Sequence, residues 1–430
     1  MNHKSAGPLD GIVVVDFSQL AQGPFATQIL GDLGADVIKI EPPSGDWMRS
    51  FSLQNAYPGG ESVSFLSYNR NKRSIALDLK NPVGTDIARR IIERADVLVE
   101  NFRPGVMDRL GLGYLDSSSR NPRLIYCASV GYGQDGPYKT RPGQDLLVQS
   151  LGGMASITGR SGDPPTPAGI GLADLTAGLH IAYGVLAALV ARARTGRGQR
   201  VDVSMLSSLL AMQGQELASY LHTGTMAERA SSGLASAYAG APLGIYPTAD
   251  GWIALSMQPI DRLAGLLGVT GFEGEATSNL IADRDEVKRR LEAGTRKRTT
   301  REWLEFLLAH DVWCAPVNDF EGVVADPQVR HEEMIVNVSH PSAGDLRLIG
   351  IPVKFSETPG SIRRPPPRLG EHALEVLREY ASARSEEIES IRASGAVVGW
   401  PTVGTGSEPP TPALSASPGS QPDPIKPVPR

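Results

Sequence analysis

The carboxylate of Asp174 is the side chain in this sequence with the clearest potential for chemistry. It stands within Gly171–Gly178, at the beginning of an apolar stretch, 174–194, that predicts a long helix. The positive end of a helix dipole lowers the pKa of a carboxylate, and the small neighbours leave room for a substrate, so Asp174 is a candidate nucleophile. The alternative is an ordinary helix cap, and the residues alone favour that interpretation.

A second group of polar side chains follows a predicted strand at 96–102. Asn101 and Arg103 stand at its end, and Arg109 follows closely. Ligands of open α/β sheets bind beyond the carboxyl ends of the strands, so Asn101 and Arg103 lie where a phosphate or an amide would dock. A solvated surface cluster with a helix-capping asparagine is the alternative.

The glycine-rich segment 131–136 matches the dinucleotide pattern G-x-G-x-x-G after a predicted strand. That pattern requires a helix at the third glycine, but Pro137 follows at once and Pro142 soon after. No acidic residue stands at the spacing that binds a ribose. We therefore expect a loop and no nicotinamide cofactor, and an NAD-dependent oxidoreductase is a distant alternative.

Metal and serine-hydrolase chemistry find little support. No two histidines have metal-binding spacing, so we expect no metal site, and His180 is best explained as a core or interface residue. Cys127 and Cys314 cannot form a disulfide framework or a cysteine-rich zinc site. No Gly-x-Ser-x-Gly elbow occurs, which argues against a serine hydrolase.

The composition is that of a globular protein with more than one domain. The chain has 430 residues, 42 basic and 47 acidic side chains and a net charge of −5, so we expect no nucleic-acid partner. We see no apolar run of the roughly 20 residues that span a membrane and no signal-peptide core, so we expect no membrane partner. These features predict a cytoplasmic protein.

Strands and helices alternate through the first part of the chain. Strands are expected at 11–18, 36–41, 74–79, 96–102, 124–130 and 198–205, and helices at 23–33, 82–95 and 174–194. This alternation predicts an α/β fold whose largely parallel sheet carries helices on both faces.

Changes in the pattern divide the chain into four parts. They are a first part of a large domain at 1–224, a smaller domain at 225–330, a return to the large domain at 331–395 and a proline- and serine-rich tail at 396–430. The small domain should contain a hairpin at 243–257, and the return should end in one helix at 371–392. The tail is too polar to bury a core, so we expect it to be disordered.

Six segments taken in order resemble the class III CoA-transferase family, which contains formyl-CoA transferase and carnitine CoA-transferase-like proteins. One such motif alone would carry little weight, but six at family-like spacing are specific. The segments are Pro8–Ile12, Gln22–Phe25, Asn69–Ile75, Val99–Gly105, Ala173–Gly178 and Thr195–Val201.

The resemblance implies a Rossmann-like large domain that binds coenzyme A, a smaller α+β domain and two interlocked subunits in a homodimer. Asp174 matches the nucleophilic aspartate of the family. The residues that match CoA contacts are Gln22, Leu77, Asp78, Leu79, Lys80, Asn101, Phe102, Arg103, Arg109 and Arg141.

The implied reaction moves CoA from an acyl-CoA to a carboxylic acid, so these two molecules are the expected partners. Asp174 would attack the thioester to give a mixed anhydride, and the released thiolate would then form an aspartyl-CoA thioester. Backbone N–H groups near Gln22 would stabilise the oxyanions, and basic side chains would hold the CoA phosphates.

The sequence departs from its relatives at two places. Formyl-CoA transferase has a glycine-rich flap after the small-domain hairpin, where this chain reads Met257–Asp261 without a glycine run. The α-methylacyl-CoA racemases share the fold but use a histidine where this chain has Gln144, which cannot exchange a proton at neutral pH. Gln144 is instead a candidate hydrogen-bond donor to substrate. A racemase or epimerase and a CoA-binding protein without catalysis remain as alternatives.

Overall fold

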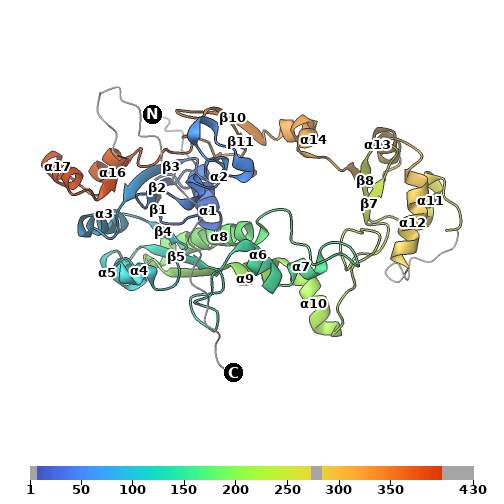
Figure 1. The fold of residues 1–430 in the computed structure, drawn as a ribbon, viewed down its shortest axis with the longest axis horizontal. Helices are drawn as coiled ribbons and strands as arrows, with labels where there is room; N and C mark the ends of the chain where they lie inside the picture. The colour runs from blue at the N-terminus through green and yellow to red at the C-terminus, as the bar shows by residue number, and fades with distance from the viewer. Residues whose placement is uncertain (1–6, 273–282, 400–430) are drawn as a thin grey trace, which may run out of the picture.

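The computed structural model describes residues 7–272 and 283–399, and they contain a large α/β domain and a smaller domain (Figure 1). The large domain is built on a seven-stranded sheet in the order β12-β3-β2-β1-β4-β5-β6. Its strands are β1 (Val13–Asp16), β2 (Asp36–Glu41), β3 (Lys72–Leu77), β4 (Val97–Glu100), β5 (Ile125–Val130), β6 (Arg200–Ser204) and β12 (Val397–Val398). All pairings are parallel except that of β12 with β3, which confirms the expected α/β class.

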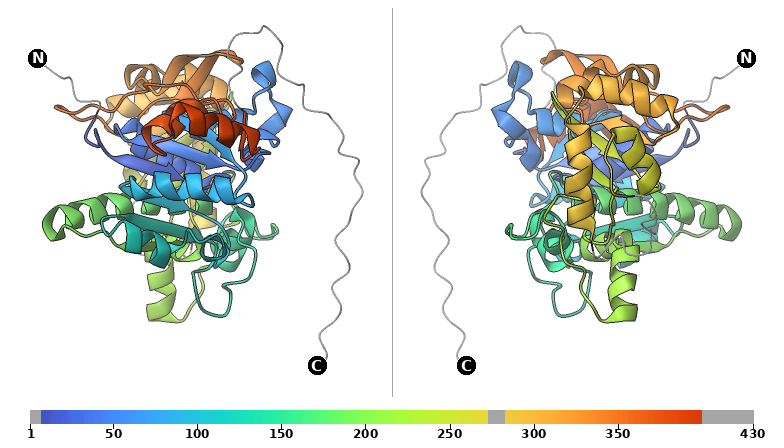
Figure 2. Two further views of the ribbon diagram at one scale, coloured as in Figure 1. Left: turned by 90° about the vertical axis from the view of Figure 1, so that its left-hand side faces the viewer. Right: turned by 90° about the vertical axis from the view of Figure 1, so that its right-hand side faces the viewer.

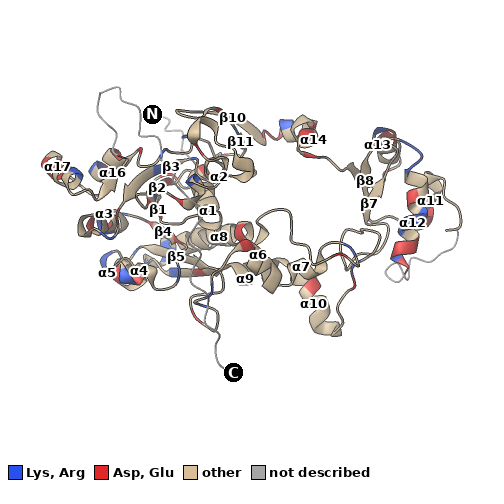
Figure 3. Ribbon diagram, in the orientation of Figure 1, with Lys and Arg blue, Asp and Glu red and all other residues tan. Residues whose placement is uncertain are grey.

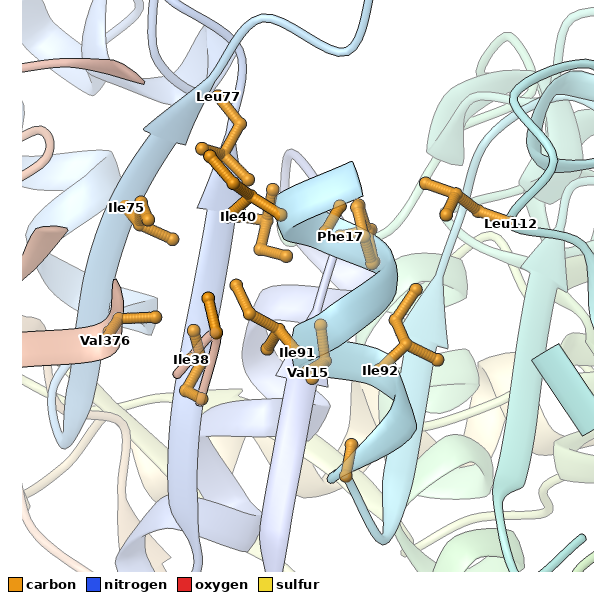
Figure 4. Packing of buried hydrophobic residues seen from close by; sticks show 14 of the residues in the cluster. Val15, Phe17, Ile38, Ile40, Ile75, Leu77, Ile91, Ile92, Leu112 and Val376 are labelled. Atoms are coloured by element: carbon orange, nitrogen blue, oxygen red, sulfur yellow. The ribbon is translucent and has the colours of Figure 1, made fainter. Parts of the chain in front are cut away.

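Both faces of the sheet are apolar because its central strands are runs of β-branched residues. On one face, Val15 and Ile38 share a core with α3 (Pro82–Glu93), α16 (Ala373–Glu379) and α17 (Ser385–Ala393). Figure 4 shows Ile91 of α3 and Val376 of α16 in this core. On the other face, strand residues such as Val14 and Val37 pack against α1 (Gln22–Asp32) and α8 (Leu172–Thr195). The sheet is therefore covered by helices on both faces, as expected.

The long helix α8 is the element that carries Asp174. It ends at Gly196, which adopts the left-handed conformation (φ 73°) that terminates many helices. By length and composition alone it could cross a membrane, contrary to our expectation that no such stretch exists. It packs against α1 and the sheet, and a buried core helix of a globular protein passes the same test. Figure 2 shows one end of α8 extending beyond the rest of the domain.

The smaller domain contains a three-stranded antiparallel sheet of β7 (Gly244–Pro247), β8 (Trp252–Leu255) and β9 (Cys314–Pro316). The β7–β8 hairpin confirms the prediction for 243–257. One face of this sheet packs on α11 (Ile260–Leu267), α12 (Arg284–Thr295) and α13 (Thr300–Ala309) through a core that includes Tyr246 and Trp303.

Two separate stretches of chain join the domains (Figure 1). The outgoing stretch contains α9 (Met205–Met212) and α10 (Gly214–Thr223), and the returning one contains α14 (Phe320–Ala325) and α15 (Pro327–His331). The return ends in an antiparallel hairpin of β10 (Ile335–His340) and β11 (Gly344–Ile349). The remaining helices are α2 (Val63–Tyr68), α4 (Val106–Arg109), α5 (Tyr114–Arg120), α6 (Asp145–Leu151) and α7 (Met154–Ile157), with short 3₁₀ turns at Trp47–Arg49, Leu53–Asn55 and Pro58–Gly60.

Two expectations for the end of the chain were wrong. The single helix predicted at 371–392 is broken into α16 and α17, and Ser382 between them has a left-handed φ of 52°, which an α-helix cannot accommodate. Residues 396–399 were assigned to the tail, but β12 lies among them and adds an edge strand to the large sheet. The rest of the predicted tail, 400–430, lies outside the described residues.

Candidate functional site

The N-terminus of α8 is capped by Asp145 and not by Asp174. Asp145, the first residue of α6, accepts hydrogen bonds at Oδ1 from the backbone N–H groups of Ala173 (2.7 Å) and Asp174 (3.2 Å). Its Oδ2 accepts one from Gln149 Nε2 at 2.6 Å. The N-cap residue of α8, Gly171, offers no side chain. The capping role that the sequence favoured for Asp174 is therefore filled by another residue.

The carboxylate of Asp174 is left without a hydrogen bond or ion pair among residues 7–272 and 283–399. Burial and the nearby charge of Asp145 raise its pKa to about 7. The predicted lowering by the helix dipole is therefore outweighed, because desolvation and a like charge both disfavour the ionised form. Burial and the charge of Asp174 also raise the pKa of Tyr68, which places this phenol near the carboxylate.

Gln22 stands at the first turn of α1, which packs on α8 one turn beyond Asp174. Its Oε1 accepts a hydrogen bond from Ser129 Oγ at 2.6 Å, and its Nε2 lies 3.5 Å from Met205 Sδ. A Cβ atom on Gly178, one turn beyond Asp174, would lie 2.8 Å from the carbonyl oxygen of Gln22. The small residue at 178 therefore serves the close contact of α1 with α8, and it does not open space for a substrate as the sequence suggested.

A cavity of about 760 Å³ brings together two of the predicted CoA contacts, Arg103 and Arg109. Lys139 and Arg200 add two cations that the sequence analysis missed, because they come from the 131–144 loop and the edge strand β6. The full lining is Arg103, Pro104, Gly105, Val106, Asp108, Arg109, Gln134, Asp135, Lys139, Thr140, Arg200 and Asp202. Arg200 is paired with Asp202 at 2.9 Å, so Arg103, Arg109 and Lys139 are the cations that suit a phosphorylated ligand.

The loop after β5 contains Arg141 and Gln144 but no nucleotide-binding helix. No helix begins at Gly136, and the next one along the chain is α6. Gly131 packs on Gly143 so closely that a Cβ atom at 131 would lie 2.5 Å from the Cα of residue 143. Arg141 is exposed and stacks on the ring of Tyr138 at 3.7 Å, outside the cavity lining. Gln144 is exposed and immediately precedes Asp145.

Asn101 and Phe102 are tied to the protein itself. Asn101 accepts a hydrogen bond from the N–H of Gln19 and donates one to the carbonyl of Gln19, both at 2.8 Å. The N–H of Phe102 donates to Glu100 Oε2 at 2.8 Å, and its ring packs on the core. Burial raises the pKa of Glu100 to about 7. Asn101 therefore holds a loop in place, whatever else it contacts.

The segment 77–80 does not line the cavity of Arg103 and Arg109. Leu77 is fully buried in the core, and Leu79 packs against the same core. Asp78 accepts a hydrogen bond from the N–H of Lys80 at 2.9 Å, and Lys80 is exposed.

The remaining candidates are structural. His180 is half-buried on α8 and packs edge-on against Tyr183, with the ring centroids 5.1 Å apart. Among the residues that the structure describes, no three acidic, histidine or cysteine side chains gather in a way that could hold a metal ion.

The sequence model of CoA-transferase family III matches residues 9–373. The chain belongs to CoA-transferase family III. It is 36% identical over 391 residues to an acyl-CoA transferase of Fusarium pseudograminearum, covering 87% of this chain and 85% of that one. It is 34% identical over 399 residues to the succinyl-CoA:glutarate CoA-transferase of Homo sapiens, covering 91% and 90% of the two chains.

A solved CAIB/BAIF family protein from Brucella suis has the same fold, with a TM-score of 0.77 and 31% identity. The match covers 87% of this chain and 100% of that one. The family resemblance read from the six motifs is thereby confirmed. The chain is a CoA-transferase, an enzyme whose substrates are CoA thioesters.

Proposed function

We propose that this enzyme moves CoA from an acyl-CoA donor to a carboxylic acid through a covalent intermediate on Asp174. The observation that carries the proposal is the carboxylate of Asp174, half-buried at the start of α8 and without a hydrogen-bond or ion-pair partner among the described residues. Asp145 already satisfies the helix N–H groups that Asp174 would otherwise cap. A half-buried carboxylate that serves no structural contact is available as a nucleophile.

The reaction proceeds in two symmetrical halves. An oxygen of Asp174 attacks the thioester carbon, the C–S bond breaks, and CoA leaves as a thiolate from the resulting mixed anhydride. The thiolate then attacks the carbonyl of Asp174 and releases the donor acid, which leaves an aspartyl-CoA thioester. The acceptor carboxylate attacks this thioester, and the thiolate released attacks the acceptor carbonyl. The products are the new acyl-CoA and the free carboxylate of Asp174.

The raised pKa of Asp174 suits this chemistry. A carboxylate of higher basicity is a better nucleophile once it is ionised, and with a pKa of about 7 a large fraction is ionised at neutral pH. The cavity of Arg103 and Arg109 supplies cations for the phosphates of CoA. Dicarboxylic acids are the first donors and acceptors to test, because the human relative is named for succinyl-CoA and glutarate.

We also propose that the enzyme works as a homodimer with interlocked subunits. The helices α8 to α10 expose a series of large apolar side chains and carry little charge (Figure 3). These side chains are Leu179, Tyr183, Val190, Met212, Leu217, Tyr220 and Leu221. Exposed apolar side chains in such number favour a protein interface. A single species of twice the chain mass in light scattering is expected, and a monomer at micromolar concentration would contradict it.

The covalent route is tested by trapping. The enzyme is mixed with succinyl-CoA and hydroxylamine, and tryptic peptides are analysed by mass spectrometry. We expect the hydroxamate on Asp174 only when acyl-CoA is present, and none in Asp174→Ala. An unmodified Asp174 during turnover would overturn the intermediate.

The same samples test the transfer itself. Incubation of succinyl-CoA with glutarate, malate, oxalate and short monocarboxylates should give a new CoA ester with at least one acid. Exchange of the α-proton of an acyl-CoA in heavy water, without any acceptor acid, would instead identify a racemase. CoA binding without either reaction would identify a binding protein.

A further inference from the structure

The loop between β1 and α1 is fastened by side chains from three neighbouring strands and their extensions. Within this loop, the N–H of Ser18 donates to Asp16 Oδ1 at 2.9 Å, and its carbonyl accepts from Lys39 Nζ at 2.8 Å. The N–H and carbonyl of Gln19 are both bonded to the amide of Asn101 at 2.8 Å. The three consecutive residues Ser18, Gln19 and Leu20 thus each have a backbone group bonded to a side chain that is distant in the sequence.

Leu20 is the strained member of the loop. Its φ of 68° lies in the left-handed region, where the Cβ atom of a non-glycine residue crowds the backbone. Its N–H donates to Asp46 Oδ1 at 3.2 Å. Asp46 in turn receives a hydrogen bond at Oδ1 from the N–H of Met48 at 3.0 Å, and its own N–H donates to Glu41 Oε2 at 3.0 Å. The acceptor of the Leu20 N–H is therefore itself fixed from two sides.

Lys39 and Asp46 form an ion pair of 2.9 Å whose two side chains are fully buried. Burying an ion pair carries a large cost of desolvation, and well-packed apolar residues would often stabilise a fold as well or better. The pair is therefore poorly explained by stability alone. What it does in this structure is hold the carbonyl of Ser18 and the N–H of Leu20.

The loop leads directly into Gln22. Ser18 also touches the first turn of α1, because a Cβ atom on Gly23 would lie 2.2 Å from the Cβ of Ser18. A displacement of Ser18 would therefore move the residues that follow, including Gln22, whose carbonyl packs on α8 at Gly178.

We propose that Lys39 and Asp46 are positioning residues for the transfer reaction, because their ion pair fixes the loop that places Gln22 and the start of α1 at the thioester. This inference rests on the proposed function. Donors to a developing oxyanion act only when they are held in place before the reaction, and a misplacement of about 1 Å costs roughly 100-fold in rate. Neither Lys39 nor Asp46 needs to touch substrate for this effect.

The test compares variants of the pair with a matched buried pair elsewhere. Lys39→Met removes the cation, and Asp46→Ala removes the acceptor of the Leu20 N–H, whereas Asp46→Asn retains an oxygen at that position. The control is Arg70→Met, which breaks the buried Arg70–Asp32 pair (2.6 Å) at the opposite, C-terminal end of α1. The kcat and KM for succinyl-CoA are measured per folded enzyme, with the folded fraction taken from circular dichroism.

We expect Lys39→Met and Asp46→Ala to lower kcat about 100-fold with KM changed less than about 3-fold, and Asp46→Asn to recover at least about 10-fold of that loss. Arg70→Met should lose stability but retain wild-type kcat. Wild-type kcat in folded Lys39→Met and Asp46→Ala, or an equal loss in Arg70→Met, would overturn the positioning role.

Two further measurements keep the test decisive. If the single variants do not fold, the neutral double variant Lys39→Met/Asp46→Asn removes the uncompensated charge and should fold with a lowered kcat. Its failure to fold would assign the pair to stability and overturn the proposal. If the wild-type enzyme transfers no CoA to any acid, the proposed function fails and this inference with it. If the wild type is active and the variants are unimpaired, only this inference fails.

Discussion

The fully buried carboxylate of Asp16 and the half-buried carboxylate of Asp174 have opposite surroundings. Asp16 accepts hydrogen bonds from Thr27 Oγ1 of α1 at 2.7 Å and from Lys72 Nζ at 3.0 Å. Burial alone would raise its pKa, but the charges of Lys72 and Lys39 outweigh burial and lower the pKa to about 2. Asp174 has no such cation, and burial with the charge of Asp145 raises its pKa to about 7.

The comparison shows that hydrogen-bond and ion-pair partners separate a structural carboxylate from a reactive one. Asp16 is locked as an anion whose lone pairs are all occupied, so it can only hold the fold together. Asp174 has no hydrogen-bond partner for its carboxylate in 7–272 or 283–399, and its pKa is raised to about 7, so it can form a bond to an incoming acyl group.

The largest expected effect is on activity at Asp174. Asp174→Asn should lower CoA transfer by about 10⁴-fold or more, since an amide cannot form the anhydride, while CoA binding is retained. Product CoA esters are measured by mass spectrometry. Asp163→Asn, an exposed carboxylate upstream of α8, should transfer at the wild-type rate. Activity of Asp174→Asn within about 10-fold of wild type would refute the contrast.

The converse effect, on stability, is expected at Asp16. Asp16→Asn leaves the buried Lys72 and Lys39 with one anion fewer and should lower the free energy of unfolding by about 3–5 kcal/mol. Urea denaturation measures this change. The control is Asp86→Asn at an exposed ion pair with Arg89 and Arg90, which should lose less than about 1 kcal/mol. Equal losses in the two variants would show that the buried network adds no more than a surface pair.

The pH dependence of stability should also separate the two carboxylates. The folded-state pKa of Asp174 is raised from 3.8 to about 7, so the folded protein binds the extra proton between these values. Stability should therefore fall as pH rises from about 4 to about 7, by a few kcal/mol in total, and then stay level. The lowered pKa of Asp16 acts in the opposite direction, and its contribution is present above pH 4 and lost as pH falls toward 2.

Asp174→Asn isolates the first of these effects. Its free energy of unfolding, measured in urea from pH 4 to pH 8, should lack the decline that the wild type shows, and the two proteins should differ most above pH 7. Parallel curves for the two proteins would mean that Asp174 titrates at an ordinary carboxylate pKa.

Much of this arrangement was predictable from the sequence, and the missing parts share a physical cause. The strands, α1 and α8 follow from local runs of apolar residues, which act within one segment. The six motifs identified the family and singled out Asp174. The parts that the sequence did not reveal join residues far apart in the chain. They are the cap that Asp145 provides, the cavity cations Lys139 and Arg200, and the two hydrogen bonds between Asn101 and Gln19.

The errors have the same origin. The predicted lowering of the pKa of Asp174 considered the helix dipole, which is local, and not desolvation or Asp145, which depend on tertiary packing. The role given to Gly178 failed because the approach of α1 cannot be read from α8. The break in 371–392 and the pairing of β12 with β3 likewise depend on tertiary structure.

The cavity adds a third kind of site, in which cations are open to a ligand. Arg103→Ala should raise the KM for acyl-CoA about 10-fold with little change in kcat, because a phosphate contact is made equally in the ground and transition states. Steady-state kinetics with succinyl-CoA measure both constants. Arg141→Ala should change KM less than Arg103→Ala, since Arg141 stacks on Tyr138 outside the lining. A larger effect at Arg141 would place the phosphates elsewhere.

The smallest and sharpest test concerns the charge that raises the pKa of Asp174. Asp145→Asn retains an oxygen that can accept from the N–H groups of Ala173 and Asp174, but it removes the like charge. In the wild type the rate of acylation should rise with pH through an inflection near 7. In Asp145→Asn the inflection should move to lower pH by about one unit, because only burial then opposes ionisation.

The shift gives Asp145→Asn a signature that a loss of structure cannot imitate. Below pH 6 the variant should acylate faster than the wild type, since more of its Asp174 is ionised, and above pH 8 it should be no faster. Single-turnover mass spectrometry of the acylated peptide measures both limits. An unmoved inflection would show that burial alone sets the pKa of Asp174 and that Asp145 serves only as the cap of α8.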